Sequence, residues 1–367
     1  MAVLKANGSF LKANGKILVK PEGGGNTVVI GGRAYPFVQI GRQLWITENL
    51  DWKKSAISIG GGQTSNPTAW YYNNDEATFG YNGNKFGLLY NYAAAEIIKD
   101  GLTNGWRISS EDDCNRLKKY VADDGNKLKS IQYWNTPGNN DTGFNMYPSG
   151  FRGSSFDEYG IYGYLRTDTI YSGTQVSFAH VVDNGTIYVG PYSSGNVGLP
   201  IRVCKDATVN IGGRDYPTTK IGSQIFLAED LQLASNSGNV GFYNKADKDY
   251  FANNSSTLFP QGWRMMDSAS IQKLKTDLNN PPNISQLLRS TTGWTQGNGT
   301  DNFGFNAMPT GYINSGGNHL EEGNAWLLRD GINGHHWLNA TNNDFSYWSD
   351  DSNTISCKFP IRLVKDA

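Results

Sequence analysis

An internal duplication constrains this chain more than any other feature of its sequence. Five short blocks occur in the same order in a first copy (residues 28–207) and in a second copy (residues 208–367). In the two copies they begin at Ile30 and Ile211, Ile40 and Ile221, Gly105 and Gly262, Gly143 and Gly304, and Pro200 and Pro360. Five blocks in register do not arise by chance. Because the period is longer than that of solenoid repeats and 367 residues suffice for two cores, the sequence predicts two tandem globular domains.

The blocks also predict the first elements of each domain. In the first copy, residues 28–40 surround a Gly-Gly turn and are typical of a hairpin, and residues 43–46 alternate as a third strand. A segment similar to a capping box at residues 109–113 predicts a helix that ends near Gly125. Residues 267–270 predict the start of the equivalent helix in the second copy.

Three further elements follow from the pattern. An earlier helix is predicted from Tyr92 to Lys99 in the first copy alone, because the second copy is shorter in this region. Trp106 and Trp263 precede the two later helices and are expected to pack under them. The closing segments 200–207 and 360–367 alternate apolar and polar residues, so we expect terminal strands that pair with the first hairpin of each domain.

Residues 1–27 are predicted to form an N-terminal arm and linker. Leu-Lys-Ala-Asn-Gly occurs at residues 4–8 and again at residues 11–15, and Asn-Gly favours tight type I′ hairpin turns. So small a β element cannot bury a core alone. We therefore expect the arm to anchor the chain by pairing with another chain or by docking on a larger body, and a loosely ordered leader is the alternative. The expected anchoring residues are Leu4, Leu11, Ile17 and Val19.

Composition and charge argue against several classes of protein. The net charge is -1 with no basic run, which argues against nucleic-acid binding, and no polybasic or long apolar segment suggests a membrane. Three widely spaced cysteines, Cys114, Cys204 and Cys357, predict neither a zinc site nor a disulfide framework. The N-terminus has no apolar signal region, so export by an N-terminal signal is not expected.

No common catalytic motif is present, and we expect no enzyme and no cofactor. Glu321 and Glu322 are adjacent, a spacing that does not place two carboxyl groups across a glycosidic bond. His335 and His336 would face opposite sides of a strand, so no metal site is predicted. Oxygen-rich segments, including residues 298–301, keep calcium-dependent sugar binding as an alternative to turn-forming loops, although EF-hand spacing is missing.

Aromatic residues are concentrated where the two copies differ most. Exposed aromatic rings with Asn, Asp and Ser neighbours suit stacking on sugar rings and hydrogen bonding to their hydroxyls, although part of this set is expected in the core. The set comprises Tyr162, Tyr164, Tyr171, Tyr188 and Tyr192 in the first copy and Trp326, Trp337, Tyr347 and Trp348 in the second. The candidate ligand-binding residues are Tyr188, Tyr192, His335, Trp337, Tyr347 and Trp348.

The motifs of the first copy occur in a characteristic order. Phe-Gly-Leu-Leu-Tyr-Asn-Tyr-Ala-Ala-Ala at residues 86–95 precedes Gly-Trp-Arg-Ile-Ser-Ser at residues 105–110, and Gly-Phe-Asn, Pro-Ser-Gly and Ile-Arg-Val-Cys-Lys-Asp follow. This order resembles the Fibrobacter succinogenes major paralogous domain family. The resemblance is weaker in the second copy, which lacks the Leu-Tyr-Asn-Tyr block. It implies an α+β fold with two tandem C-type-lectin-like domains, in which two helices flank small antiparallel sheets and a long loop region carries binding.

The family resemblance implies a surface module without an established reaction. The repeated arm is similar to the N-termini of structural proteins from phages of Bacteroides-type bacteria, including crAss-like phages. We therefore expect a non-catalytic virion surface protein, a head or tail fibre or decoration, assembled in the host cytoplasm. Its arm would bind other virion proteins and form a homo-oligomer, and its domains would adhere to host or mucosal glycans. The alternative is a secreted bacterial adhesin or polysaccharide-binding module.

Overall fold

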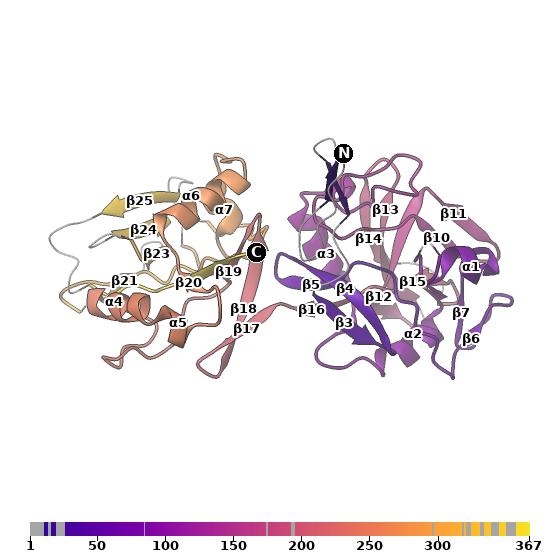
Figure 1. Cartoon of the computed structure of the whole chain (residues 1–367), viewed down its shortest axis with the longest axis horizontal. Helices are drawn as coiled ribbons and strands as arrows, with labels where there is room; N and C mark the ends of the chain where they lie inside the picture. The colour runs from indigo at the N-terminus through magenta and orange to yellow at the C-terminus, as the bar shows by residue number, and fades with distance from the viewer. Residues whose placement is uncertain are drawn as a thin grey trace. The chain divides into compact units, whose positions relative to one another are not determined.

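The computed structural model describes residues 11–13, 16–19, 26–83, 85–173, 175–191, 195–295, 297–317, 319–320, 324–330, 334–338, 345–349 and 357–367. For residues 11–13, 16–19, 319–320, 324–325, 334–338 and 346–349 it describes the backbone only. The chain divides into two compact units, one comprising Met1–Val38, Trp45–Glu111 and Gly125–Cys204 and the other Gln39–Leu44, Asp112–Asp124 and Lys205–Ala367. Strands and helices occur in both copies, so the fold class is α+β, as predicted (Figure 1).

A five-stranded sheet forms the centre of the first copy. Its order is β3 (Thr27–Ile30), β4 (Arg33–Ile40), β5 (Gln43–Ile46), β16 (Val203–Asp206) and β9 (Arg107–Ile108). Gly31 and Gly32 form the first turn with φ of 59° and 83°, a conformation that glycine adopts without strain. The predicted hairpin and third strand are confirmed. The closing strand joins this sheet between β5 and β9 and not beside the first hairpin, which corrects that expectation.

The second copy contains a sheet with the same strand order. It runs β17 (Thr208–Ile211), β18 (Arg214–Ile221), β19 (Gln224–Leu227), β26 (Leu363–Asp366) and β20 (Arg264–Met265). Gly212 and Gly213 repeat the turn of the first copy with φ of 60° and 86°. Here too the closing strand lies beside the third strand, and it pairs with β19 and β20.

Three predicted helices are present. They are α2 (Tyr92–Lys99), α3 (Glu111–Tyr120) and α6 (Ser268–Asp277). The Asp267 side chain caps α6 by accepting a hydrogen bond from the Ser270 backbone N–H. Shorter helices are α1 (Glu76–Phe79), α5 (Ser255–Leu258), α7 (Ile284–Leu288) and the 3-10 turns η1 (Tyr72–Asn74) and η2 (Gly125–Lys127).

The second copy also contains the earlier helix, so the prediction that only the first copy has it is wrong. Helix α4 (Lys245–Asn253) begins at Asn244, whose side chain forms a capping box with Asp247. Tyr243 precedes this cap and donates from its hydroxyl to the Leu231 and Leu233 carbonyls at 3.0 and 2.8 Å. In the first copy Tyr90 and Asn91 occupy the same places before α2, so a Tyr-Asn pair precedes this helix in both copies.

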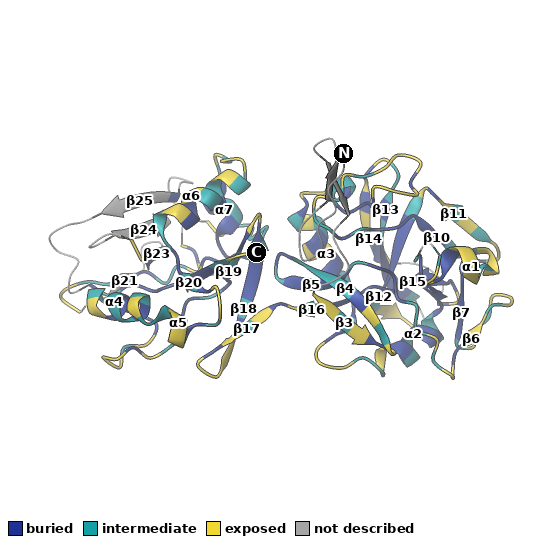
Figure 2. Cartoon of the chain, in the orientation of Figure 1, coloured by how far each residue is buried: buried dark blue, intermediate teal, exposed yellow. Residues whose placement is uncertain are grey.

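Buried residues line both faces of the second-copy sheet (Figure 2). Successive strand residues alternate between faces, and Trp263 shares its cluster with Met265 and Phe251. Met266 lies in the other cluster with Ile271 and Leu274 of α6. The expectation that Trp263 packs under α6 is therefore wrong, because the side-chain alternation places this indole on the α4 side.

Trp106 is the counterpart of Trp263 in the first copy. It precedes β9 and makes an edge contact with Phe37 of β4, with 5.5 Å between the ring centroids. The contact that the structure gives for this indole is thus with the sheet.

Smaller sheets complete the fold. In the first copy they are β6 (Ser58–Ile59), β7 (Thr68–Trp70), β8 (Leu89–Tyr90) and β15 (Leu199–Pro200); β10 (Ser149–Arg152) with β11 (Phe156–Tyr159); and β12 (Tyr162–Ser172), β13 (Gln175–Val182) and β14 (Ile187–Pro191). In the second copy they are β21 (Tyr312–Ile313) with β22 (His319–Leu320), and β23 (Asn324–Leu327), β24 (Gly334–Leu338) and β25 (Phe345–Ser349). Among the residues that the structure describes, no helix is both long and apolar enough to cross a membrane.

The arm contains an antiparallel two-stranded sheet of β1 (Leu11–Ala13) and β2 (Lys16–Val19), as predicted for these residues. Leu11 lies on β1, and Ile17 and Val19 lie on β2. Leu4, the remaining expected anchoring residue, lies outside the described residues.

Candidate functional site

An aromatic ladder crosses the sheet β12–β13–β14 in the first copy. Tyr164, His180 and Tyr188 are direct cross-strand partners, and successive ring centroids are 5.4 and 5.3 Å apart. Tyr164 is buried, whereas 41% of Tyr188 is exposed. Burial lowers the pKa of His180 to about 4, so its ring is neutral near pH 7. The ladder therefore connects the core to an exposed, uncharged aromatic edge.

The other candidate residues were expected to join Tyr188 as ligand contacts. Tyr192 lies outside the described residues. His335 and Trp337 lie on β24, and Tyr347 and Trp348 lie on β25. The register pairs His335 with Trp348 and His336 with Tyr347. Along these two strands His335, Trp337 and Trp348 therefore share one set of alternating positions, and Tyr347 belongs to the other set. These strands belong to a different sheet from Tyr188.

Trp326 illustrates why part of the aromatic set is core. This side chain is fully buried and donates from its indole Nε1 to Asp230 at 2.7 Å. Tyr171, in contrast, is exposed at the far end of β12, where its hydroxyl contacts Glu111.

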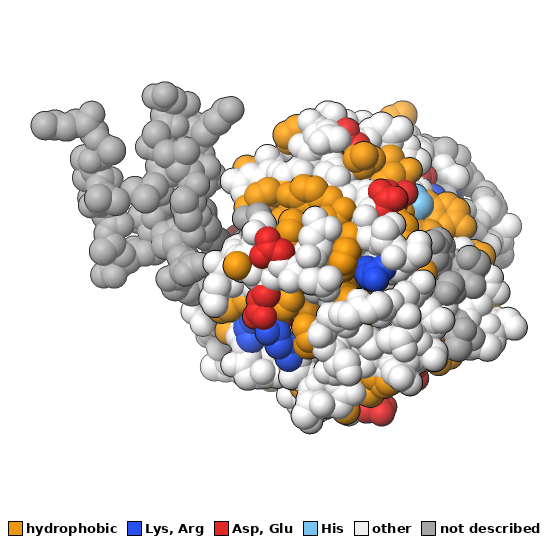
Figure 3. Space-filling view, turned by 90° about the vertical axis from the view of Figure 1, so that its right-hand side faces the viewer, with side chains coloured by type: hydrophobic (Ala, Val, Ile, Leu, Met, Phe, Trp, Pro, Cys, Tyr) orange, Lys and Arg blue, Asp and Glu red, His pale blue; other side chains and the backbone are white. Residues whose placement is uncertain are grey.

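A second exposed aromatic surface was not predicted. We call Tyr133 and Tyr159, with the flanking Ile131 and Ile161, the tyrosine platform; these side chains are 38%, 37%, 62% and 40% exposed, respectively. The Asn135 backbone N–H donates to the Gly160 carbonyl at 3.0 Å and holds the two chain segments together. Hydrophobic side chains gather on the face of the first copy that carries β10, β11 and α1 (Figure 3).

Buried rings support the platform from below. Phe86 is almost completely buried, and its ring centroid lies 5.1 Å from that of Tyr133 and 5.6 Å from that of Tyr159. The ring of Tyr147 also packs against that of Tyr133, with 6.2 Å between the ring centroids. Because each exposed ring rests on a packed neighbour, the platform presents rigid aromatic faces to solvent.

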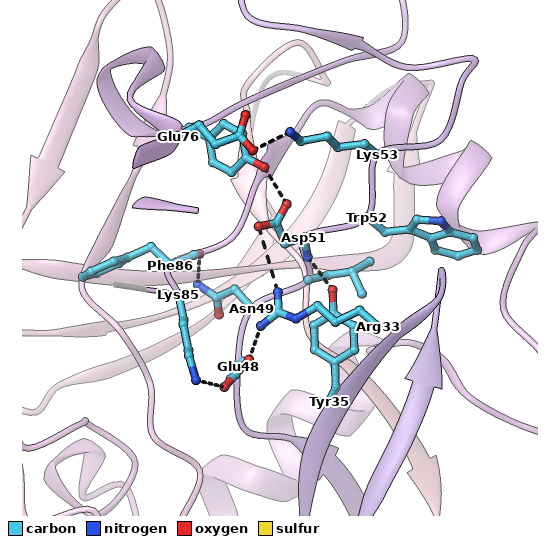
Figure 4. A network of polar contacts seen from close by, with 12 residues as sticks. Arg33, Tyr35, Glu48, Asn49, Asp51, Trp52, Lys53, Glu76, Lys85 and Phe86 are labelled. Atoms are coloured by element: carbon cyan, nitrogen blue, oxygen red, sulfur yellow. Dashed lines mark hydrogen bonds and ion pairs between the residues drawn. The ribbon is translucent and has the colours of Figure 1, made fainter. Parts of the chain in front are cut away.

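The polar network in Figure 4 positions Phe86 under the platform. Asn49 donates from its side-chain amide to the Phe86 carbonyl at 2.8 Å, and it accepts from the buried Arg202 at 2.9 Å. Arg202 also donates to the Asn145 carbonyl at 2.7 Å, and burial lowers its pKa to about 10. One guanidinium thus joins the segment after the third strand, the segment before the closing strand and the segment before β10.

The neighbouring part of the network is framework, because the second copy repeats it. Arg33 pairs with Glu48 in the first copy, as Arg214 pairs with Glu229 in the second at 2.8 Å. The Tyr35 hydroxyl accepts from the Asp51 backbone N–H at 2.9 Å, and burial raises its pKa to about 12. The hydroxyl of the equivalent Tyr216 likewise accepts a backbone hydrogen bond.

The backbone of Tyr133 is strained. Its φ of 71° lies in the left-handed region, which costs a bulky L-residue about 1–2 kcal/mol. Sequence reasoning missed the platform because one chain does not reveal its φ angles. The available signal was the second copy, where Gly293 stands one residue before Trp294, as Tyr133 stands before Trp134.

The oxygen-rich segment at residues 298–301 makes turn contacts. Asn298 accepts from the Trp294 backbone N–H at 3.1 Å, and Asp301 accepts from the Asn306 backbone N–H at 2.8 Å. Burial raises the pKa of Asp301. Within the described parts of the chain, no three His, Cys, Asp or Glu side chains gather in a way that could hold a metal ion.

The comparison with protein families decides the identity of the first copy. Residues 38–205 match the model of the Fibrobacter succinogenes major domain. This part of the chain belongs to that family. The curated proteins and the solved structures give no significant match. Residues 38–205, the Fibrobacter succinogenes major domain, include the aromatic ladder and the whole tyrosine platform. Both surfaces are therefore parts of this domain.

Proposed function

We propose that the chain is a non-catalytic virion surface protein that adheres to host or mucosal glycans through two lectin-like domains. The observation that carries this proposal is the exposure of Tyr133, Tyr159 and Tyr188, each more than one third exposed and each packed on other rings. Rigid aromatic faces beside neutral hydrogen-bonding groups suit the C–H face and the hydroxyls of sugar rings.

Shared framework contacts support two domains of one kind. The central sheets have the same strand order, and Tyr-Asn pairs begin α2 and α4 in the same way. The closing strands each follow a buried arginine, Arg202 in the first copy and Arg362 in the second. These residues maintain a common scaffold, and the exposed rings of the first copy lie outside it.

The two-stranded sheet of the arm supports an attachment role. An isolated hairpin of this size is at best marginally stable in water, so pairing with another chain would stabilise it. We propose that the arm binds other virion proteins and forms a homo-oligomer. Several weak glycan sites would then act together and raise the effective affinity.

Binding by the intact chain tests the adhesion function. In native electrophoresis through gels that contain laminarin, galactomannan or gastric mucin, we expect at least one of these glycans to retard the purified protein and leave its own chains unshortened. Equal mobility in all gels would contradict glycan adhesion, and shortening of the glycan would contradict a non-catalytic role. Immunogold labelling of particles against labelling of bacterial surfaces separates the virion protein from the alternative, a secreted adhesin or polysaccharide-binding module.

A further inference from the structure

We infer that the tyrosine platform is the glycan contact of the first copy, and that Tyr133 is kept in a strained conformation because its ring stacks on a neutral pyranose. This inference rests on the proposed adhesion function and names its site. It begins from a difference between the two copies at one backbone position.

The loop that carries Tyr133 has the same framework in both copies. Ser130 donates from its hydroxyl to the carbonyl two residues later at 2.6 Å, and Ser290 does the same at 2.7 Å. Trp134 donates from its indole Nε1 to the Met146 carbonyl at 2.9 Å, as Trp294 does to Ala307 at 3.1 Å. These contacts fix the loop on both sides of the residue that precedes the tryptophan.

That fixed loop demands a positive φ at its third position. In the second copy the residue is Gly293 with φ of 91°, which glycine adopts freely. In the first copy it is Tyr133 with φ of 71°. A tyrosine stands where the fold itself favours glycine, so its side chain must contribute something that glycine lacks.

Packing is only part of that contribution. The ring of Tyr133 contacts Phe86, yet 38% of the residue remains exposed, and Phe86 already packs against Phe79 and Tyr147. Tyr159 is exposed to the same extent and follows a second residue in the left-handed region, Glu158 with φ of 63°. A residue in the left-handed region thus carries one ring of the platform and directly precedes the other, and such residues are concentrated at binding sites.

The neighbouring side chains select the chemistry of the ligand. Exposed neutral groups lie beside Tyr133, namely Gln132, Asn135 and Thr136. Segments 131–136 and 156–161 contain no Lys or Arg, and the second contains Asp157 and Glu158. An anionic ligand such as a nucleic acid needs cationic partners, whereas a neutral sugar needs an aromatic face with amide and hydroxyl groups around it. The platform therefore fits a neutral pyranose.

The variant Tyr133→Gly tests this assignment in the full chain, because it restores the residue that the second copy carries. We expect its dissociation constant for the retained neutral glycan, laminarin or galactomannan, to rise at least tenfold, while its melting temperature stays equal or increases. Tyr133→Phe should keep most of the affinity. Tyr171→Ala removes an exposed tyrosine elsewhere on the first copy and should bind as the wild type does.

Three results would overturn the inference. An unchanged glycan affinity of Tyr133→Gly would show that the tyrosine platform is not the glycan contact, and the proposed adhesion function would remain. A melting temperature several degrees lower would show that Tyr133 serves the fold. Binding of heparin in preference to neutral glycans would contradict the ligand class. Failure of the wild-type chain to bind any of the glycans would instead defeat both the site and the proposed function.

Discussion

Asn49 and Asp230 occupy the same place in the two copies. Their side-chain oxygens accept hydrogen bonds from the two buried arginines of the closing segments. Asn49 accepts from Arg202 at 2.9 Å, so that guanidinium is satisfied by an amide and by carbonyl groups. Asp230 accepts from Arg362 at 2.9 and 3.1 Å and forms a buried ion pair with it. At one position the buried arginine is thus neutralised by a carboxylate in the second copy and only hydrogen-bonded by neutral groups in the first. The free energies of these two arrangements can be compared within one chain.

Asp230→Ala should lower the free energy of unfolding of the second copy by about 3–5 kcal/mol, because it leaves Arg362 charged and unpaired in the core. Trp326 would also lose its hydrogen-bond acceptor. Asp230→Asn should be less damaging, since the first copy shows that an amide can hold the arginine. Urea unfolding followed by tryptophan fluorescence measures both variants. Equal losses for the two variants would show that the negative charge of Asp230 is required, and that a neutral oxygen acceptor on a side chain of the same shape cannot replace it.

Helices α2 and α4 show how much of an element's start depends on its cap. Asn244 accepts from the Asp247 backbone N–H at 3.1 Å and remains partly exposed. Asn91 caps α2 through the Ala94 backbone N–H at 2.9 Å, and it also donates to the Thr64 and Asn66 carbonyls from a fully buried position. The same residue type therefore performs a local role in one copy and a long-range role in the other.

Asn244→Ala should lower the free energy of unfolding by about 1 kcal/mol, the usual loss of an N-cap. Asn91→Ala should lower it by several times as much, because the buried Thr68 backbone N–H would lose its acceptor and the Thr64 and Asn66 carbonyls would lose their donor. Chemical denaturation of each single variant measures the two losses. If the loss at Asn91 is no larger than that at Asn244, the loop contacts of Asn91 do not stabilise the fold.

Local signals predicted the elements that depend on them, and contacts across the chain decided the rest. The Gly31-Gly32 turn and the Asp267 cap were readable because a short segment specifies each. Helix α4 was missed because only Tyr243 and Asn244 remain of the motif, and their meaning depends on the distant Leu231 and Leu233 carbonyls.

The candidate site was predicted less completely than the fold, for a physical reason. Tyr188 was recognised as an aromatic residue in a variable region, and it is exposed. Tyr133 was missed because it lies next to the buried Trp134, and because the strain that distinguishes it is a property of the backbone. Composition shows that aromatic rings are present, but the fold determines which of them remain at the surface.

At the scale of the whole molecule, the arm and the domains have separate tasks in the proposed function. The arm contributes a two-stranded sheet of its own, and the exposed tyrosines lie within residues 38–205. Attachment and adhesion should therefore be separable by truncation.

Deletion of residues 1–25 should leave the melting temperature and the glycan affinity of each single site unchanged, because the described core contacts begin after this segment. The effective affinity for a multivalent glycan should fall, because the sites of several chains no longer act together. The truncated chain should lose oligomerisation and incorporation into particles, since a hairpin that pairs with other chains is removed. Calorimetry, light scattering on a sizing column and immunoblots of purified virions measure these properties. The full chain is the control for each. A truncated chain that still forms the same oligomer and enters virions would show that attachment resides in the domains, and the arm would then have no anchoring role.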